Sequence, residues 1–276
     1  MNKNKLHKEI NRILDPQTAV KGIKDFCDRN LNQVGKSLRV NDNKGEGVLF
    51  VGGRKLITTD NCQLPSALVN LKNLKNEVGL SYAIFNARQK PMGAYQIISW
   101  ESPLVRHTSR VPGNLAVKCD LVAYDAKSKQ LVAVEVKLDP ENDDTNIQHG
   151  LLQSMAYAHL LQHSLKTDRS GLRHQVQRCL RKWCCEKQAN LPEVRTVACA
   201  LAAPKEYFRA SLKTHGEKLW ISKAIKTKDA HFSKFWVLEF DCIKSEGESR
   251  GSKCIPQTNC KVRLFSDVNE LAKFCL

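Results

Sequence analysis

The sequence predicts an α/β protein with a mixed central β-sheet flanked by helices and a small N-terminal appendage. Residues 116–137 form two apolar segments around a short polar turn, which is typical of a β-hairpin. Helical periodicity precedes this hairpin at 65–88 and follows it at about 145–163. Apolar segments at 194–202 and 235–240 predict further strands. A hydrophobic content of 42% supports a substantial core.

The expected elements before the hairpin are helical at first. Residues 1–45 contain short basic helical segments, and residues 48–58 resemble a small hairpin whose turn is Gly-Gly. The helix at 65–88 has Pro65 in its first turn. Its apolar stripe consists of Leu71, Leu74, Val78, Tyr82 and Phe85. A strand at Tyr95–Arg106 follows.

After the hairpin, a breaker at 139–144 precedes the helix at 145–163. Residues 170–187 predict a basic amphipathic helix, and 205–213 a helix between the last two core strands. The tail at 254–276 is expected to form a strand and a final helix. The predicted domains are an N-terminal appendage, a core, and a linker with a C-terminal tail, at residues 1–60, 61–244 and 245–276.

The hairpin carries charged residues inside apolar strands. If its turn centres on Lys127-Ser128, residues whose numbers sum to 255 face each other, so Asp120 lies opposite Glu135. Lys137 is two residues from Glu135 and shares its face. Two carboxylates and an ammonium are costly to bury without a purpose, which a divalent metal and a phosphate would supply. The opposite face of the second strand is an uninterrupted apolar surface of Val132, Val134, Val136 and Leu138.

An acid-x-Lys triplet alone is common, and the chain has three of them. Those at Asp42 and Asp125 lie in a loop and in the hairpin turn, where such residues are ordinary. Only Glu135-Val136-Lys137 lies within an apolar strand beside a second acid. The alternative interpretation is a half-exposed hairpin with solvated charges.

Asp120, the hairpin and Glu135-Val136-Lys137 together resemble the core motif of the PD-(D/E)XK nuclease superfamily, over roughly residues 65–205. Cys119 replaces the proline of that motif. The resemblance implies a restriction-endonuclease-like fold with Mg²⁺, or Mn²⁺, as cofactor. It implies that Asp120, Glu135 and the Val136 carbonyl hold the metal. Lys137 is then expected to orient the attacking water or to stabilise the charge that develops on the phosphate.

A glutamate on the helix before the sheet often completes the metal site in that family, and Glu77 is the best-placed candidate. Glu101 is the alternative ligand, and a solvated helical glutamate is the alternative interpretation of Glu77. Gln153 and Tyr157 are four residues apart and share a helical face. Gly150 lies nearly one turn earlier on the same face and has no side chain there. Their spacing resembles a Gln-x-x-x-Tyr motif of the exonuclease-like branch of the superfamily, and implies a role in positioning substrate. Otherwise they are packing residues.

The net charge of +16 favours a polyanionic partner, and we expect nucleic acid, in particular DNA. Arg173, Arg178, Arg181 and Lys182 are candidate phosphate contacts; a solvated helix face is the alternative. An anionic membrane is the competing partner. The sequence contains no apolar run of 18 residues, so we expect no bilayer-spanning segment. The N-terminal residues lack the apolar core of a signal peptide, so we expect a cytoplasmic protein that is not secreted.

Eleven cysteines without a C-x-x-C motif are expected to be reduced and buried. An iron–sulfur cluster held by Cys179, Cys184 and Cys185 is an alternative, although the spacing of these cysteines is poor. His159 and His163 are i,i+4 on a predicted helix, but no partner in the sequence accompanies them in a zinc site.

The sequence thus predicts a metal-dependent nuclease that hydrolyses phosphodiester bonds of DNA. The alternative is a non-catalytic nucleic-acid-binding protein on the same fold. An Ala substitution of Lys137 is expected to abolish cleavage and to leave folding nearly intact.

Overall fold

A computed structural model gives the structure of the chain. It describes residues 3–12, 15–37, 68–70, 77–86, 95–104, 117–125, 127–138, 146–167, 176, 194, 196–242 and 257–276. The expected hairpin at 48–58 and the basic helix at 170–187, apart from the buried Val176, lie outside these ranges. The linker at 245–252 lies outside them as well.

The described strands form one mixed sheet in the order β1-β7-β6-β5-β4-β3-β2. Strand β5 runs parallel to both β4 and β6, and the other neighbouring pairs are antiparallel. The strands are β1 (Leu68–Asn70), β2 (Tyr95–Pro103), β3 (Lys118–Asp125), β4 (Gln130–Val136), β5 (Val197–Pro204), β6 (Phe232–Cys242) and β7 (Gln257–Phe265). The expected α/β class with a mixed sheet is therefore confirmed.

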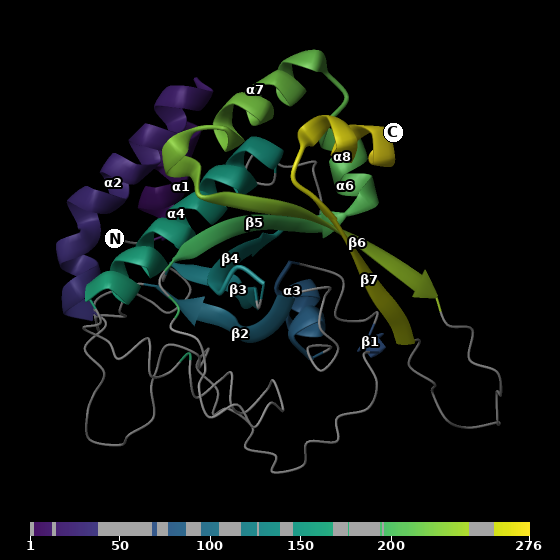
Figure 1. Cartoon of the computed structure of the whole chain (residues 1–276), viewed down its shortest axis with the longest axis horizontal. Helices are drawn as coiled ribbons and strands as arrows, with labels where there is room; N and C mark the ends of the chain where they lie inside the picture. The colour runs from purple at the N-terminus through teal and green to yellow at the C-terminus, as the bar shows by residue number, and fades with distance from the viewer. Residues whose placement is uncertain are drawn as a thin grey trace, which may run out of the picture.

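Helices cover the sheet on both faces (Figure 1). Helix α3 (Glu77–Asn86) lies on one face, where Leu80 and Ile84 pack against β2, β3 and β4. The other face carries α1 (Lys3–Asn11), α2 (Pro16–Ser37), α4 (Ile147–Thr167), α6 (Lys205–Ser211), α7 (His215–Ile225) and α8 (Val268–Cys275). A short 3₁₀ turn, η6 (Lys228–Ala230), precedes β6.

The N-terminal helices α1 and α2, expected as an appendage, pack against the core. Leu6 of α1 and Ile23 and Phe26 of α2 belong to the same buried cluster as the inner face of α4. The physical reason is that α4 is apolar around most of its circumference, so it needs cover on the side away from the sheet. The C-terminal strand and helix are confirmed, and they too join the core: β7 pairs with β6, and α8 buries Val268 and Leu271.

The helix expected at 65–88 is wrong in its first part. Leu68–Asn70 is a strand that pairs with β7, and the helix begins only at Glu77. Its buried positions are Leu80, Ser81 and Ile84, while Val78 of the expected stripe is 54% exposed. Helix α7 was not expected; its capping box of Thr214 and Glu217 is the sequence signal that marks its start.

Candidate active site

The predicted register of the β3–β4 hairpin is confirmed. Tyr124 pairs with Leu131 and Leu121 pairs with Val134, so the residue numbers of each pair sum to 255. Beyond Leu121 the strands separate, and β4 continues along β5, with Val136 beside Ala202. The Asp120 carboxylate accepts a hydrogen bond from the Val136 N–H at 2.8 Å. The two sequence-predicted acids therefore lie where β3 leaves β4.

Glu135 and Lys137 form an ion pair of 2.8 Å that is almost removed from solvent. The exposed fractions of Glu135 and Lys137 are 1% and 3%. Burial raises the pKa of the Glu135 carboxyl, and the nearby Lys137 ammonium offsets part of that rise. Burial alone would lower the pKa of Lys137, but the carboxylates of Glu135, Glu77 and Asp120 together raise it. Lys137 is therefore a cation at neutral pH.

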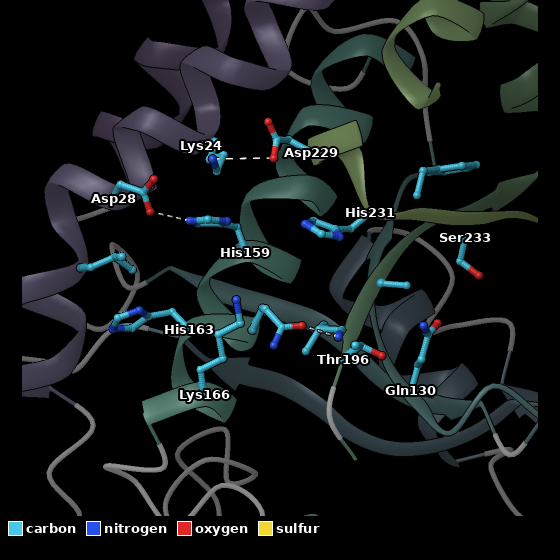
Figure 2. A pocket seen from close by; sticks show the side chains of 15 residues that line it. Lys24, Asp28, Gln130, His159, His163, Lys166, Thr196, Asp229, His231 and Ser233 are labelled. Carbon is cyan, nitrogen blue, oxygen red and sulfur yellow. Dashed lines mark hydrogen bonds and ion pairs between the residues drawn. The ribbon is translucent and has the colours of Figure 1, made fainter. Parts of the chain in front are cut away.

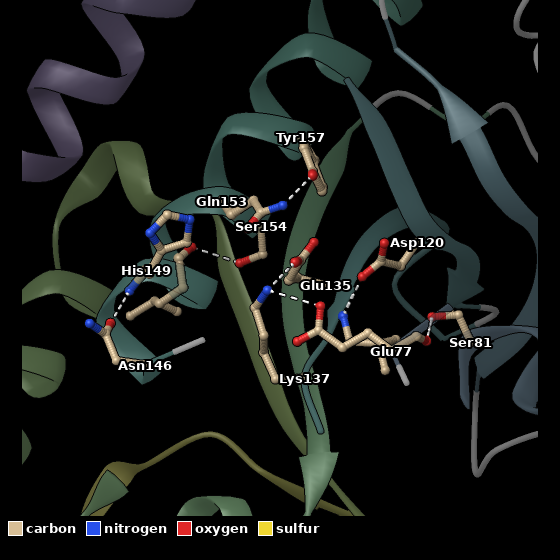
Figure 3. A network of polar contacts seen from close by, with 12 residues as sticks. Glu77, Ser81, Asp120, Glu135, Lys137, Asn146, His149, Gln153, Ser154 and Tyr157 are labelled. Atoms are coloured by element: carbon tan, nitrogen blue, oxygen red, sulfur yellow. Dashed lines mark hydrogen bonds and ion pairs between the residues drawn. The ribbon is translucent and has the colours of Figure 1, made fainter. Parts of the chain in front are cut away.

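Glu77 reaches the same cluster from the opposite layer. It is the first residue of α3, its side chain is 33% exposed, and its Oε2 lies 3.5 Å from the Lys137 ammonium. This cluster of Glu77, Asp120, Glu135 and Lys137 combines one helix and two strands (Figure 3). The alternative ligand Glu101 is in β2, and its side chain is outside the described part of the chain.

Helix α4 supplies the neighbouring polar pair. The Gln153 amide donates a short hydrogen bond to the Tyr157 hydroxyl, and both residues are buried (Figure 3). Burial raises the pKa of Tyr157, and the charges of Glu135 and Asp120 raise it further, so this hydroxyl lies near the carboxylates and stays protonated. Asn146 directly precedes this helix, and its side-chain oxygen accepts a hydrogen bond from the His149 N–H at 2.7 Å.

Gly150 allows α4 to approach the strands closely. A Cβ at this position would lie 3.0 Å from Leu201 Cδ1 of β5 and 3.2 Å from Lys137 Cγ. The Lys137 side chain is therefore held between β5 and the backbone of α4. The absence of bulk expected at Gly150 from the sequence is confirmed.

Several buried acceptor oxygens in this region have no hydrogen-bond partner among the described residues. They are Oε1 of Glu77, Oε2 of Glu135 and Oε1 of Gln153. An unsatisfied buried carboxylate oxygen is costly, and carboxylate and carbonyl oxygens are the ligands that Mg²⁺ prefers. Within the described ranges, no group of three or more His, Cys, Asp or Glu side chains that could hold a metal ion is found. The donor set fits a hard divalent cation by its chemistry.

Two groups near the cluster had no local signal in the sequence. The Lys3 ammonium of α1 lowers the pKa of Glu135, so its charge acts on the cluster from the start of the chain. Burial raises the pKa of Tyr207 of α6, and the charges of Glu77 and Glu135 raise it further. Lys3 and Tyr207 are each more than 65 positions from the nearest cluster residue with which they interact electrostatically. Periodicity and spacing in the sequence therefore cannot reveal these interactions.

Four cysteines, Cys27, Cys119, Cys199 and Cys275, are buried free thiols, as expected. Cys119, in the place of the motif's proline, donates from Sγ to the Leu121 carbonyl at 3.0 Å. Burial raises its pKa, and Asp120 and Glu135 raise it further. Cys179, Cys184 and Cys185 lie outside the described residues, as do Arg173, Arg178, Arg181 and Lys182. The candidate phosphate contacts therefore stay predictions, and the iron–sulfur alternative is untested.

Comparison of the chain with protein-family models, with curated proteins and with solved structures gives no match in any of the three. No helix in the described part of the chain is both long and apolar enough to cross a membrane.

Proposed function

We propose that the chain is a metal-dependent nuclease with a restriction-endonuclease-like fold, which hydrolyses phosphodiester bonds of DNA. The observation that carries this proposal is the buried Glu135–Lys137 pair, with Asp120 and Glu77 beside it, at the point where two strands separate. A stability role alone explains such a pair poorly, because apolar residues of the same volume are usually at least as stabilising.

The order of the elements supports the same proposal. Helix α3 with Glu77 comes first, the β3–β4 hairpin with Asp120 and Glu135-Val136-Lys137 follows, and α4 with Gln153 and Tyr157 comes next. This is the order that the resemblance to PD-(D/E)XK nucleases implies. The net charge of +16 supports a polyanionic substrate, because lysine and arginine contacts to phosphates supply most of the sequence-independent affinity for nucleic acid.

Each residue has a distinct part in the proposed reaction. Asp120, Glu135, the Val136 carbonyl and Glu77 would hold Mg²⁺ or Mn²⁺, which supplies a nucleophilic water and neutralises phosphate charge. Lys137 is a cation, so it is not the general base. Its ammonium donates hydrogen bonds that orient the attacking water and stabilise the charge that develops on the phosphate. Gln153 and Tyr157 position the substrate beside the carboxylates.

The test is cleavage of circular, linear and branched DNA with Mg²⁺, Mn²⁺ or EDTA. Wild type is compared with Asp120→Asn and with Asp25→Asn, a matched change of an exposed aspartate on α2. We expect cutting that requires the metal, falls to background in Asp120→Asn and persists in Asp25→Asn. Binding of DNA without cutting under every metal condition would instead indicate the non-catalytic nucleic-acid-binding protein.

A further inference from the structure

A second concave region lies at the other end of the strands that carry the catalytic cluster. It is a pocket of about 730 Å³ at the starts of the neighbouring parallel strands β4, β5 and β6, marked by Gln130, Val197 and Phe232 (Figure 2). Glu135 is five residues further along β4 than Gln130, which corresponds to about 17 Å of extended strand. The pocket is therefore separate from the catalytic cluster.

Cationic and titratable side chains surround this pocket. Lys24 comes from α2, His159, His163 and Lys166 come from α4, and His231 follows η6 (Figure 2). The two imidazoles that α4 carries at i,i+4 thus face groups from two other elements. The sequence places these elements far apart, so it offers no sign of this convergence.

Two carboxylates lie at the same pocket, and each contacts a basic side chain. Asp28 is 2.7 Å from the His159 ring, and Asp229 forms an ion pair of 3.6 Å with the Lys24 ammonium. Lys166 adds a positive charge beyond these two contacts. Burial lowers the pKa of His231, and the charges of His159, Lys166 and Lys24 lower it further against the opposing effect of Asp229. The lysine side chains at this pocket favour an anion beside the His231 ring.

The rest of the lining suits an organic group attached to that anion. Leu31, Val197, Ala198 and Phe232 provide apolar and aromatic surface beside the charged groups. A volume of this order is typical of sites for nucleotide-sized ligands, which combine apolar walls with a few placed polar groups. Ammonium and imidazolium groups are suitable donors to phosphate oxygens.

We propose that this pocket binds the phosphate group of a nucleotide, with the base and sugar against its apolar wall. The phosphate comes either from a free nucleotide or from the phosphorylated end of a DNA strand. Lys166, His231 and Lys24 are the phosphate donors, and Asp229 competes with the phosphate for Lys24. The proposal does not depend on nuclease activity.

Calorimetric titration of the full chain in EDTA tests the proposal, with deoxyadenosine 5′-monophosphate as the probe and deoxyadenosine as its phosphate-free control. We expect saturable binding of the nucleotide only. Lys166→Gln should weaken it roughly tenfold, because it removes a charged donor. Asp229→Asn should strengthen it severalfold, because it releases Lys24. Lys213→Gln, an exposed lysine outside the pocket, is the matched control and should change nothing.

Opposite effects of Lys166→Gln and Asp229→Asn are difficult to obtain from misfolding, so they separate recognition from a loss of structure. Absence of saturable nucleotide binding, equal binding of the nucleoside, or equal losses in Lys166→Gln and Lys213→Gln would overturn the proposal. Short strands with a 5′-phosphate or a 5′-hydroxyl then distinguish the two sources. The titration is done in EDTA and does not require the metal, so a negative titration does not contradict the nuclease proposal. A failed cleavage assay likewise does not contradict the proposed nucleotide pocket.

Discussion

Glu135 and Lys137 show how burial changes the consequence of a substitution. From the sequence, loss of the Lys137 side chain was expected to affect cleavage and hardly to affect folding. In the structure both charges are buried, and the ammonium is within 4 Å of two carboxylates. Removal of one partner leaves an uncompensated buried charge, so the free energy of unfolding depends on this pair as well.

Lys137→Met should lower the free energy of unfolding at neutral pH by about 3–5 kcal/mol, because it leaves Glu135 buried without its counter-ion. Addition of Glu135→Gln to the same chain should recover much of that loss, since the buried negative charge is then removed too. Urea unfolding of the wild type, the two single variants and the double variant gives the coupling free energy of the pair. Lys223→Met, at an exposed position on α7, is the control. If Lys137→Met were as stable as the wild type, this would contradict the burial of the Glu135–Lys137 ion pair.

At the scale of elements, the close approach of α4 to β4 and β5 brings the Gln153–Tyr157 pair and the ion pair together. The approach depends on one position, because Gly150 faces both Leu201 and the aliphatic part of Lys137. Glycine within a helix normally costs stability relative to alanine. Its presence here is explained by the lack of space for a side chain.

Gly150→Ala should therefore gain no stability, or lose about 1 kcal/mol, because Leu201 or Lys137 must move by a few tenths of an ångström. Cleavage should decrease with it, since the displaced group belongs to the cluster. Gly216→Ala in α7 is the matched control, because the nearest atom to its Cβ, Thr214 Oγ1, is 4.0 Å away. Thermal unfolding and cleavage rates compare the two variants. If both variants were stabilised equally and cleavage were unchanged, α4 would have room for a side chain at position 150.

Across the molecule, the N-terminal helices and the sheet share one buried core. Residues from α1 and α2 share a buried cluster with α4, β5 and α8. Helix α4 packs on β3 and β4, and α1 and α2 in turn cover α4. The charges of Glu135 and Lys137, which the sequence places on a strand face, are therefore interior groups.

Ile23→Ala on α2 should lower the free energy of unfolding by about 2–5 kcal/mol, because Ile23 is 1% exposed and its truncation leaves a cavity against the core. Val78→Ala, at an exposed position on α3, should change it by less than about 0.5 kcal/mol. Chemical unfolding followed by both fluorescence and circular dichroism measures the two effects. If the first helices unfolded separately from the sheet, Ile23→Ala would shift only one phase of a two-phase transition.

Local spacing was enough to predict the parts of the candidate site that lie close together in the chain. The length of the turn fixed the β3–β4 register, and helical periodicity placed Gln153 and Tyr157 on one face with Gly150 near them. These features depend on backbone geometry over a few residues, so they can be calculated from spacing.

Contacts between distant segments followed from packing and could not be predicted from spacing. It paired Leu68–Asn70 with β7, placed Glu77 beside Lys137, and put α1 and α2 over α4. It also gathered Lys24, His159 and His231 around the second pocket. A short apolar segment has no fixed preference for helix or strand on its own, and its conformation follows from the partner that buries it. The sequence therefore determined which charges share a strand face, and packing between distant segments decided that these charges are buried and what surrounds them.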